Sequence, residues 1–127
     1  MYTRLIPVLP VSNVPTERRF YEALGFDLHV DPDEQYPESV FASLRFGPSI
    51  LFGVSVSPEF QPESAESRLW WQFETSDLDA VHRLAMDAAL PIVQPPTVEE
   101  WGRRTLKLRS PNGYLVTFEE AGQSSSA

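Results

Sequence analysis

Few residues in this 127-residue chain are suited to acid–base or metal chemistry. There are two histidines and no cysteine, so disulfides, thiolate nucleophiles and cysteine-held zinc are excluded. His29 lies close to Asp31, and His82 follows Asp79 by three residues, a spacing that places both on one side of a helix. Each histidine could be a ligand or a general base. The simpler interpretation, which we favour, is a surface imidazole beside an acid.

The net charge of the chain limits the classes of molecule that it is expected to bind. Eighteen acidic residues against ten basic ones give a net charge of −8 at pH 7. Such a field repels phosphate backbones and attracts cationic small molecules, so we expect no nucleic-acid partner. No run approaches the roughly 20 apolar residues of a membrane helix, and the first residues lack the apolar run of a signal peptide. We therefore expect a cytoplasmic protein with no membrane partner.

The chain reads as an internal repeat. Shifted by 64 residues, its two halves align without a gap, and each reads as a strand, a helix and three further strands. We expect one domain over residues 1–121, with a first repeat at 4–56, a linker at 57–67 and a second repeat at 68–121. Residues 122–127 have nothing to bury, which predicts a disordered tail.

Helix boundaries are marked by capping residues. Asn13 is suited to begin the first helix and Gly25 to end it. In the second half, Ser76 with Asp79 three residues later resembles a capping box. The proline-containing segment 94–100 is predicted to be a loop that could close over a pocket.

Several motifs together resemble those of the vicinal-oxygen-chelate superfamily, which contains glyoxalase I, extradiol dioxygenases and bleomycin-resistance proteins. The similar stretches are Val8-Leu9-Pro10-Val11-Ser12-Asn13, Phe20-Tyr21-Glu22-Ala23-Leu24-Gly25-Phe26, Ser76-Asp77-Leu78-Asp79-Ala80, Trp101-Gly102-Arg103-Arg104-Thr105 and Ser110-Pro111-Asn112-Gly113-Tyr114. The resemblance implies an α+β fold in which two βαβββ repeats form a curved mixed sheet around a central cavity. It does not fix an activity, because the fold hosts unrelated ones.

In enzymes of this superfamily, the resemblance implies a divalent metal held by His, Gln or Glu on the first and last strands of each repeat. By register those positions are Ile6, Gly53, Trp70 and Thr117. Isoleucine and glycine offer no side-chain donor, and an indole N–H cannot coordinate a metal. A single threonine hydroxyl is a weak ligand. We therefore expect no metal and no cofactor.

The resemblance then favours the bleomycin-resistance type, a non-enzymatic, metal-free and dimeric protein that sequesters an aromatic or cationic organic ligand. The alternative is a glyoxalase-like lyase or dioxygenase-like enzyme with an atypical metal site, for which Glu74, Glu119 and His29 are the candidate catalytic residues. A third possibility is an interaction module whose hollow is filled by its own side chains.

Strand alternation predicts which side chains face the hollow. The predicted ligand-binding residues are Ile6, Val8, Leu51, Gly53, Trp70, Gln72, Trp101, Arg103, Thr105 and Thr117. Trp70 could stack on a ligand or pack as core, and Trp101 could contact a ligand or anchor its loop. Arg103 and Arg104 point to opposite faces, so one of them could neutralise Glu74 or Glu119.

Overall fold

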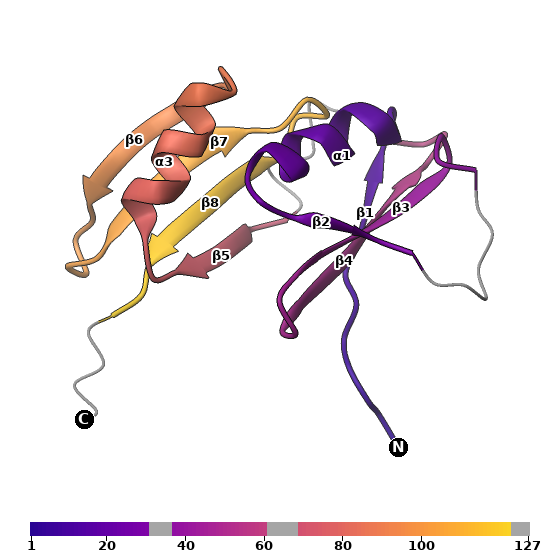
Figure 1. Cartoon of the computed structure of the whole chain (residues 1–127), viewed down its shortest axis with the longest axis horizontal. Coiled ribbons are helices and arrows are strands. Elements are labelled where there is room, and N and C mark those ends of the chain that lie inside the picture. The colour runs from indigo at the N-terminus through magenta and orange to yellow at the C-terminus, as the bar shows by residue number, and fades with distance from the viewer. Residues whose placement is uncertain (31–36, 61–68, 123–127) are drawn as a thin grey trace. The chain divides into compact units, whose positions relative to one another are not determined.

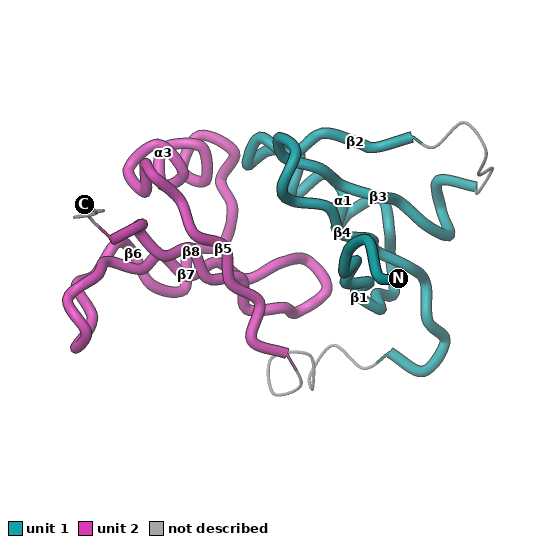
Figure 2. The backbone as a smooth tube through the Cα atoms, turned by 90° about the horizontal axis from the view of Figure 1, so that it is seen from below, with its two compact units in different colours: residues 1–62 teal, residues 63–127 magenta. Residues whose placement is uncertain are grey.

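The structure is a computed structural model that describes residues 1–30, 37–60 and 69–122. Two compact units divide the chain, one at residues 1–62 and the other at residues 63–127 (Figure 2). Each unit consists of a mixed four-stranded sheet and a helix. The predicted α+β class with two βαβββ modules is confirmed.

Unit 1 has the sheet order β1-β4-β3-β2, in which β1 runs parallel to β4 and the other pairs are antiparallel (Figure 1). Its elements are β1 (Val8–Val11), α1 (Val14–Ala23), β2 (Asp27–His29), β3 (Phe41–Phe46) and β4 (Ile50–Val56). Helix α1 covers one face of this sheet. Between them, Tyr21 is fully buried and packs edge-on against Phe52, with ring centroids 4.9 Å apart.

Unit 2 repeats this topology in the order β5-β8-β7-β6. Its elements are β5 (Trp71–Thr75), α3 (Leu78–Asp87), β6 (Ile92–Val98), β7 (Arg104–Arg109) and β8 (Leu115–Glu120). Helix α3 packs on the face that carries Leu106, Leu108 and Val116, all fully buried. On the same face the rings of Phe73 and Phe118 stack with centroids 5.5 Å apart.

Backbone register repeats with the same 64-residue shift that relates the two halves of the sequence. Val8 is paired with Gly53 in unit 1, and Gln72 with Thr117 in unit 2. The two helices, Val14–Ala23 and Leu78–Asp87, are related by the same shift. Because side chains alternate along a strand, equal register places equivalent residues on equivalent faces.

The structure confirms the predicted N-cap residue of the first helix and corrects that of the second. Asn13 Oδ1 accepts a hydrogen bond from Thr16 N at 3.1 Å, which confirms the predicted first cap. The second helix is capped by Asp77, whose Oδ1 accepts from Ala80 N at 3.0 Å, so the prediction of Ser76 was wrong. Asp77 lies 64 residues after Asn13, and a carboxylate fills the same role as an amide oxygen.

The predicted loop at 94–100 was also wrong in its extent. Strand β6 continues to Val98 through Pro95 and Pro96, with shifts of register on either side of Gln94. It is an edge strand of its sheet, where a missing N–H leaves no ladder partner unsatisfied.

Some expectations lie outside the described residues. They are Asp31 beside His29, the linker residues from 61 to 67 and the tail from 123. Within the described ranges, no helix is long and apolar enough to span a membrane.

Candidate ligand site

The sheet of unit 2 has a face opposite α3 that carries polar side chains, here called the polar face. On β5, Phe73 points to the helix, so its neighbours Gln72 and Glu74 point to the polar face. Their partners on β8 are Thr117 and Glu119, and β7 contributes Thr105 and Lys107. Trp70 directly precedes β5 on the same side of the alternation.

Two tryptophans are joined across this face by hydrogen bonds. Trp70 Nε1 donates to Gln72 Oε1 at 2.8 Å, and Gln72 Nε2 donates to Glu119 Oε2 at 2.8 Å. From the other side, Trp101 Nε1 donates to Glu119 Oε1 at 2.6 Å. We call these four residues the indole–carboxylate chain. The N–H groups of both indoles are hydrogen-bonded within the protein, while 74% of the Trp70 surface and 59% of the Trp101 surface remain exposed.

Neither tryptophan ring is packed in the core of unit 2. Three quarters of the Trp70 surface is accessible. Trp101 does anchor its turn, through the N–H bond to Glu119, yet its ring is not packed inside the unit. A held indole with an exposed face is suited to stack on a planar ligand, because little side-chain entropy remains to be lost.

Trp101 lies in the turn between β6 and β7. Glu99 N donates to Arg103 O at 2.9 Å, Gly102 N donates to Glu99 O at 2.9 Å, and Gly102 has a φ of 91°. The Glu99 side chain fixes the turn to the sheet: its Oε1 accepts from Thr105 Oγ1 at 2.6 Å and from Gln94 Nε2 at 3.0 Å. These two hydrogen bonds lower the pKa of Glu99, since they favour its ionised form.

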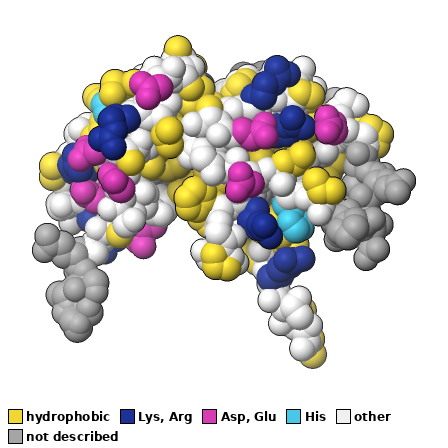
Figure 3. Space-filling model, viewed as in Figure 1, with side chains coloured by type: hydrophobic (Ala, Val, Ile, Leu, Met, Phe, Trp, Pro, Cys, Tyr) yellow, Lys and Arg dark blue, Asp and Glu magenta, His cyan; other side chains and the backbone are white. Residues whose placement is uncertain are grey.

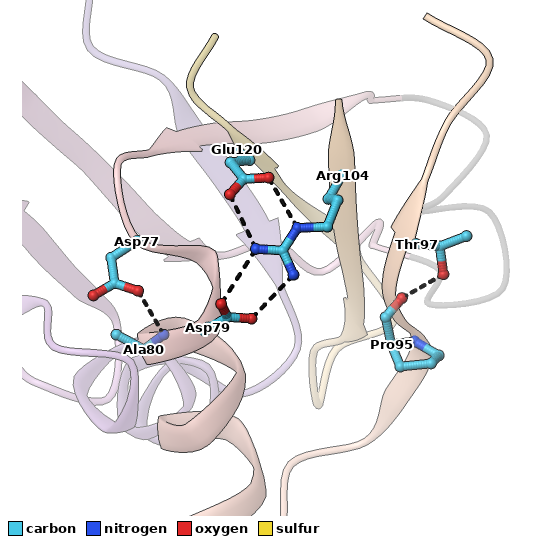
Figure 4. A network of polar contacts seen from close by, with 7 residues as sticks. All are labelled: Asp77, Asp79, Ala80, Pro95, Thr97, Arg104 and Glu120. Carbon is cyan, nitrogen blue, oxygen red and sulfur yellow. Dashed lines mark hydrogen bonds and ion pairs between the residues drawn. The ribbon is translucent and has the colours of Figure 1, made fainter. Parts of the chain in front are cut away.

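The two adjacent arginines separate as alternation predicts. Arg103 Nη1 lies 3.6 Å from Glu74 Oε2 on the polar face. Arg104 points to the helix face, where Nε and Nη2 bind the Glu120 carboxylate and Nη1 and Nη2 bind Asp79 (Figure 4). Figure 3 shows acidic and basic side chains lying next to one another on the face that it draws.

Arg104 joins three elements of unit 2, since Asp79 lies in the first turn of α3 and Glu120 ends β8. Its hydrogen bonds and charge lower the pKa of Asp79 and of Glu120, and the two carboxylates raise the pKa of Arg104. This group, called the Arg104 clasp below, fixes the helix against the sheet whose opposite face carries the tryptophans.

The predicted ligand residues of unit 1 lie on the sheet face opposite α1. Val8, Gly53 and Ser43 form one row across the strands. The space above Gly53 is filled by Phe41, whose ring atoms lie 3.0 and 3.1 Å from where a Cβ would stand. Ile6, Val8 and Leu51 are exposed or half-buried and supply apolar surface to this face.

Two of the three candidate catalytic residues have partners within unit 2, and the third lies in unit 1. Glu74 and Glu119 are direct cross-strand partners, but Glu74 is paired with Arg103 and Glu119 accepts two hydrogen bonds. His29 lies on β2 of unit 1, opposite Ser43.

The donor set does not fit a resident metal. The implied ligand positions offer two side chains without any donor, an indole N–H and one hydroxyl. Among the described residues, no three His, Cys, Asp or Glu side chains gather closely enough to hold a metal ion.

Glu119 and Lys107 lie on the polar face but were not among the predicted ligand contacts. Glu119 links both indoles, and Lys107 lies opposite Thr117. Alternation along 115–120 and 104–109 already places both on the face of Thr117 and Thr105. The signal was therefore present in the sequence, but nothing in it revealed which polar groups join the tryptophans.

Fold and site together define a class of protein: a pair of βαβββ modules, one of which presents an aromatic and polar sheet face. The family model described as the Glyoxalase/Bleomycin resistance protein/Dioxygenase superfamily matches residues 5–118, so the chain belongs to that superfamily. The family suggested by the sequence motifs is confirmed.

Solved structures share this fold at low identity. A bleomycin-binding protein in complex with bleomycin has a TM-score of 0.71 at 20% identity, over 95% of this chain and 100% of that one. The bleomycin resistance determinant encoded on transposon Tn5 gives 0.69 at 19%, over 94% and 98%. A glyoxalase/dioxygenase from Nostoc punctiforme gives 0.71 at 14%, over 97% and 99%. No curated protein matches the chain in sequence.

Proposed function

We propose that the protein is a metal-free small-molecule-binding protein of the bleomycin-resistance type, which holds an aromatic or cationic organic ligand. The observation that carries the proposal is the indole–carboxylate chain: two exposed indoles, each held by its N–H, on either side of the Glu119 carboxylate. An indole face binds planar rings and cations, and a carboxylate between two such faces adds charge for a cation.

Each predicted contact takes a role in this proposal. Trp70 and Trp101 stack on the ligand, Gln72 orients Trp70, and Arg103 limits the negative charge by pairing with Glu74. Thr105 and Thr117 form the floor of the polar face, since both are almost fully buried. On unit 1, Ile6, Val8, Leu51 and Gly53 are proposed as contacts on that unit's own face.

A titration with organic ligands tests this proposal. The ligand panel is bleomycin, 1-naphthoate, 1-naphthamide and 1-naphthylmethylammonium, and binding is measured by calorimetry and by tryptophan fluorescence. We expect at least one of them to bind, and Trp70→Ala to weaken that binding about tenfold, the effect of losing one aromatic contact of about 1.4 kcal/mol.

The control is Met86→Ala, which removes another exposed large side chain, on α3, and should leave affinity unchanged. If no ligand of the panel binds, or if Trp70→Ala binds as well as the unchanged protein, the proposal is wrong.

We also propose that the protein is a homodimer that acts in the cytoplasm. Strand β1 is an edge strand, and the segment before it exposes Tyr2, Leu5 and Ile6. Apolar side chains along an edge favour contact with a second copy. Light scattering coupled to gel filtration measures the mass directly, and a value near the 14.4 kDa of one chain would exclude the dimer.

A role in drug resistance is the finer form of the proposal. If bleomycin is the ligand, expression of the protein in a bleomycin-sensitive bacterium should raise the tolerated concentration, and expression of Trp70→Ala should raise it less.

A further inference from the structure

We propose that the polar face of unit 2 contains a carboxylate subsite formed by Lys107 and Thr117, so that the ligand is an aromatic compound bearing a carboxylate. This inference rests on the proposed function, because it names the ligand class of the same site. It narrows the choice between an aromatic and a cationic ligand and adds Lys107 to the predicted ligand contacts.

Position is the first observation. Lys107 on β7 and Thr117 on β8 are direct cross-strand partners, and Thr117 is in turn the partner of Gln72 on β5. Side chains of directly opposite residues have Cβ atoms about 4.5–5.5 Å apart. An ammonium and a hydroxyl at that separation can both donate to the two oxygens of one carboxylate.

The second observation concerns the partners of these two side chains within the described residues. Lys107 is half-buried and Thr117 is 3% exposed. Across residues 1–30, 37–60 and 69–122, neither side chain forms a hydrogen bond or an ion pair with another described residue. Within the described residues, the Lys107 ammonium therefore has all its donors available for a ligand acceptor, and the neighbouring Thr117 hydroxyl can supply one more.

The other charged groups of this face have partners already. Glu74 is paired with Arg103, and Arg109 Nη1 donates to Gly113 O at 3.2 Å. Glu119 accepts from Gln72 and Trp101. Glu99 is near enough for Lys107 to contribute to the lowering of its pKa, but its hydrogen bonds come from Thr105 and Gln94. Lys107 is therefore the cation left for a ligand on the described part of this face.

Charge arithmetic favours a single negative charge on the ligand. One ammonium and one neutral hydroxyl compensate a monoanion, whereas a phosphate dianion would keep an uncompensated charge beside Glu119 in a protein of net charge −8. The place of the aromatic part follows from Gln72 on the neighbouring strand. Gln72 is the cross-strand partner of Thr117, and its side chain holds the Trp70 indole. A carboxylate on this subsite would therefore carry its ring toward Trp70.

The repeat provides an internal comparison. The positions equivalent to Lys107 and Thr117 in unit 1 are Ser43 and Gly53, which are partners of each other in the same register. They offer no cation, and Phe41 lies over Gly53. The same backbone geometry therefore presents the donors Lys107 and Thr117 in unit 2 and the Phe41 ring over Gly53 in unit 1. The fold alone does not require a donor pair at these positions.

The sequence makes this subsite unusually easy to test, because Lys107 is the sole lysine of the chain. Reductive methylation with ¹³C-formaldehyde labels that side chain and the N-terminal amine while keeping the charge. The NMR signal of methylated Lys107 should shift on addition of acetate, which carries no aromatic ring, and should not shift on addition of acetamide.

Binding affinity gives the second readout, measured with ligands that share the naphthalene ring system. We expect 1-naphthoate to bind about tenfold more tightly than 1-naphthamide, equal to about 1.4 kcal/mol, and Lys107→Met to abolish that preference. The matched control is Arg109→Met, which removes a neighbouring cation that already has a partner and should keep the preference.

The outcomes separate this inference from the function on which it rests. Equal binding of naphthoate and naphthamide, or tightest binding of 1-naphthylmethylammonium, overturns the carboxylate subsite and leaves the binding function standing. If no aromatic ligand binds, the proposed function is wrong, and the acetate titration alone decides the subsite. A Lys107 signal that acetate does not move then overturns the subsite as well.

Discussion

The contacts of Arg104 predict how the free energy of unfolding depends on pH. It holds Asp79 and Glu120, and the pKa of each carboxyl is lowered from its ordinary value of 3.8 or 4.5. A carboxyl whose pKa is lower in the folded state stabilises the fold fully above its unfolded value, and that stability is lost as the pH falls through the folded value. We therefore expect the free energy of unfolding to decrease with acidification below about pH 4.5.

Arg104→Met should make this pH dependence shallower, because both carboxyls then return toward their ordinary pKa values. Urea unfolding between pH 7 and about pH 3 measures the slope. The control is Arg103→Met, which breaks the longer and more exposed contact to Glu74 and should leave the slope as it is. A slope as steep in Arg104→Met as in the unchanged protein would show that the clasp does not account for it.

Ala89 gives a second prediction at this scale. It follows α3 with a φ of 54°, in the left-handed region, whereas the equivalent residue after α1 is Gly25 with a φ of 98°. A Cβ at such a φ costs about 1 kcal/mol, which glycine avoids. We expect Ala89→Gly to stabilise the protein by about that amount in urea unfolding, and Gly25→Ala to destabilise it. Ala88→Gly, at a φ of −90°, is the control that should not stabilise.

Among the elements, the contact between β3 and β4 leads to a prediction with a change of sign. An Ala at position 53 would place its Cβ 3.0 Å from the Phe41 ring, closer than ordinary contact. Gly53→Ala should therefore destabilise the protein by about 1 kcal/mol. In a Phe41→Leu background the clash disappears, and Ala should stabilise the strand relative to glycine by about 0.5 kcal/mol. Thermal unfolding of the four proteins of this cycle measures the coupling. Equal effects in both backgrounds would show that Phe41 does not rest on Gly53.

The order of the elements could be predicted from the sequence, because it depends on local patterns. Asn13 and Gly25, for example, mark α1 at nearly its observed bounds. The misplaced features were those where chemistry is ambiguous. Ser76 and Asp77 are both good caps, and the 64-residue shift onto Asn13 would have decided between them. The prolines of β6 read as a loop, because the sequence does not reveal which strand lies at an edge.

The candidate site could be predicted only in part, for a related reason. Alternation gives the face on which Trp70, Gln72 and Thr117 lie, since a strand has a period of two. It does not give the partner of each polar group, because that depends on rotamers and on side chains from several strands. Glu119 was thus considered as an acid, and its role as the acceptor that joins Trp70 and Trp101 emerged only from the structure.

For the whole molecule, net charge and fold respond to acid at different pH. The net charge of −8 at pH 7 vanishes near the isoelectric point of 4.6, whereas the lowered pKa values of Asp79 and Glu120 keep the Arg104 clasp ionised to lower pH than ordinary carboxyl groups. Loss of net charge removes the repulsion that keeps copies apart, and only further acidification protonates the clasp and loosens α3 on its sheet. We expect solubility to reach its minimum near pH 4.6 with the fold intact, and ellipticity to fall only on further acidification.

Turbidity and circular dichroism, recorded on the same samples from pH 7 downward, separate these two effects. Arg104→Met removes one positive charge and the clasp together, so its solubility minimum should move to lower pH, while its ellipticity should depend less on pH below that minimum. Arg103→Met removes the same charge without the clasp and should move only the solubility minimum. If both variants change the ellipticity profile equally, net charge rather than the clasp determines the acid stability of the protein.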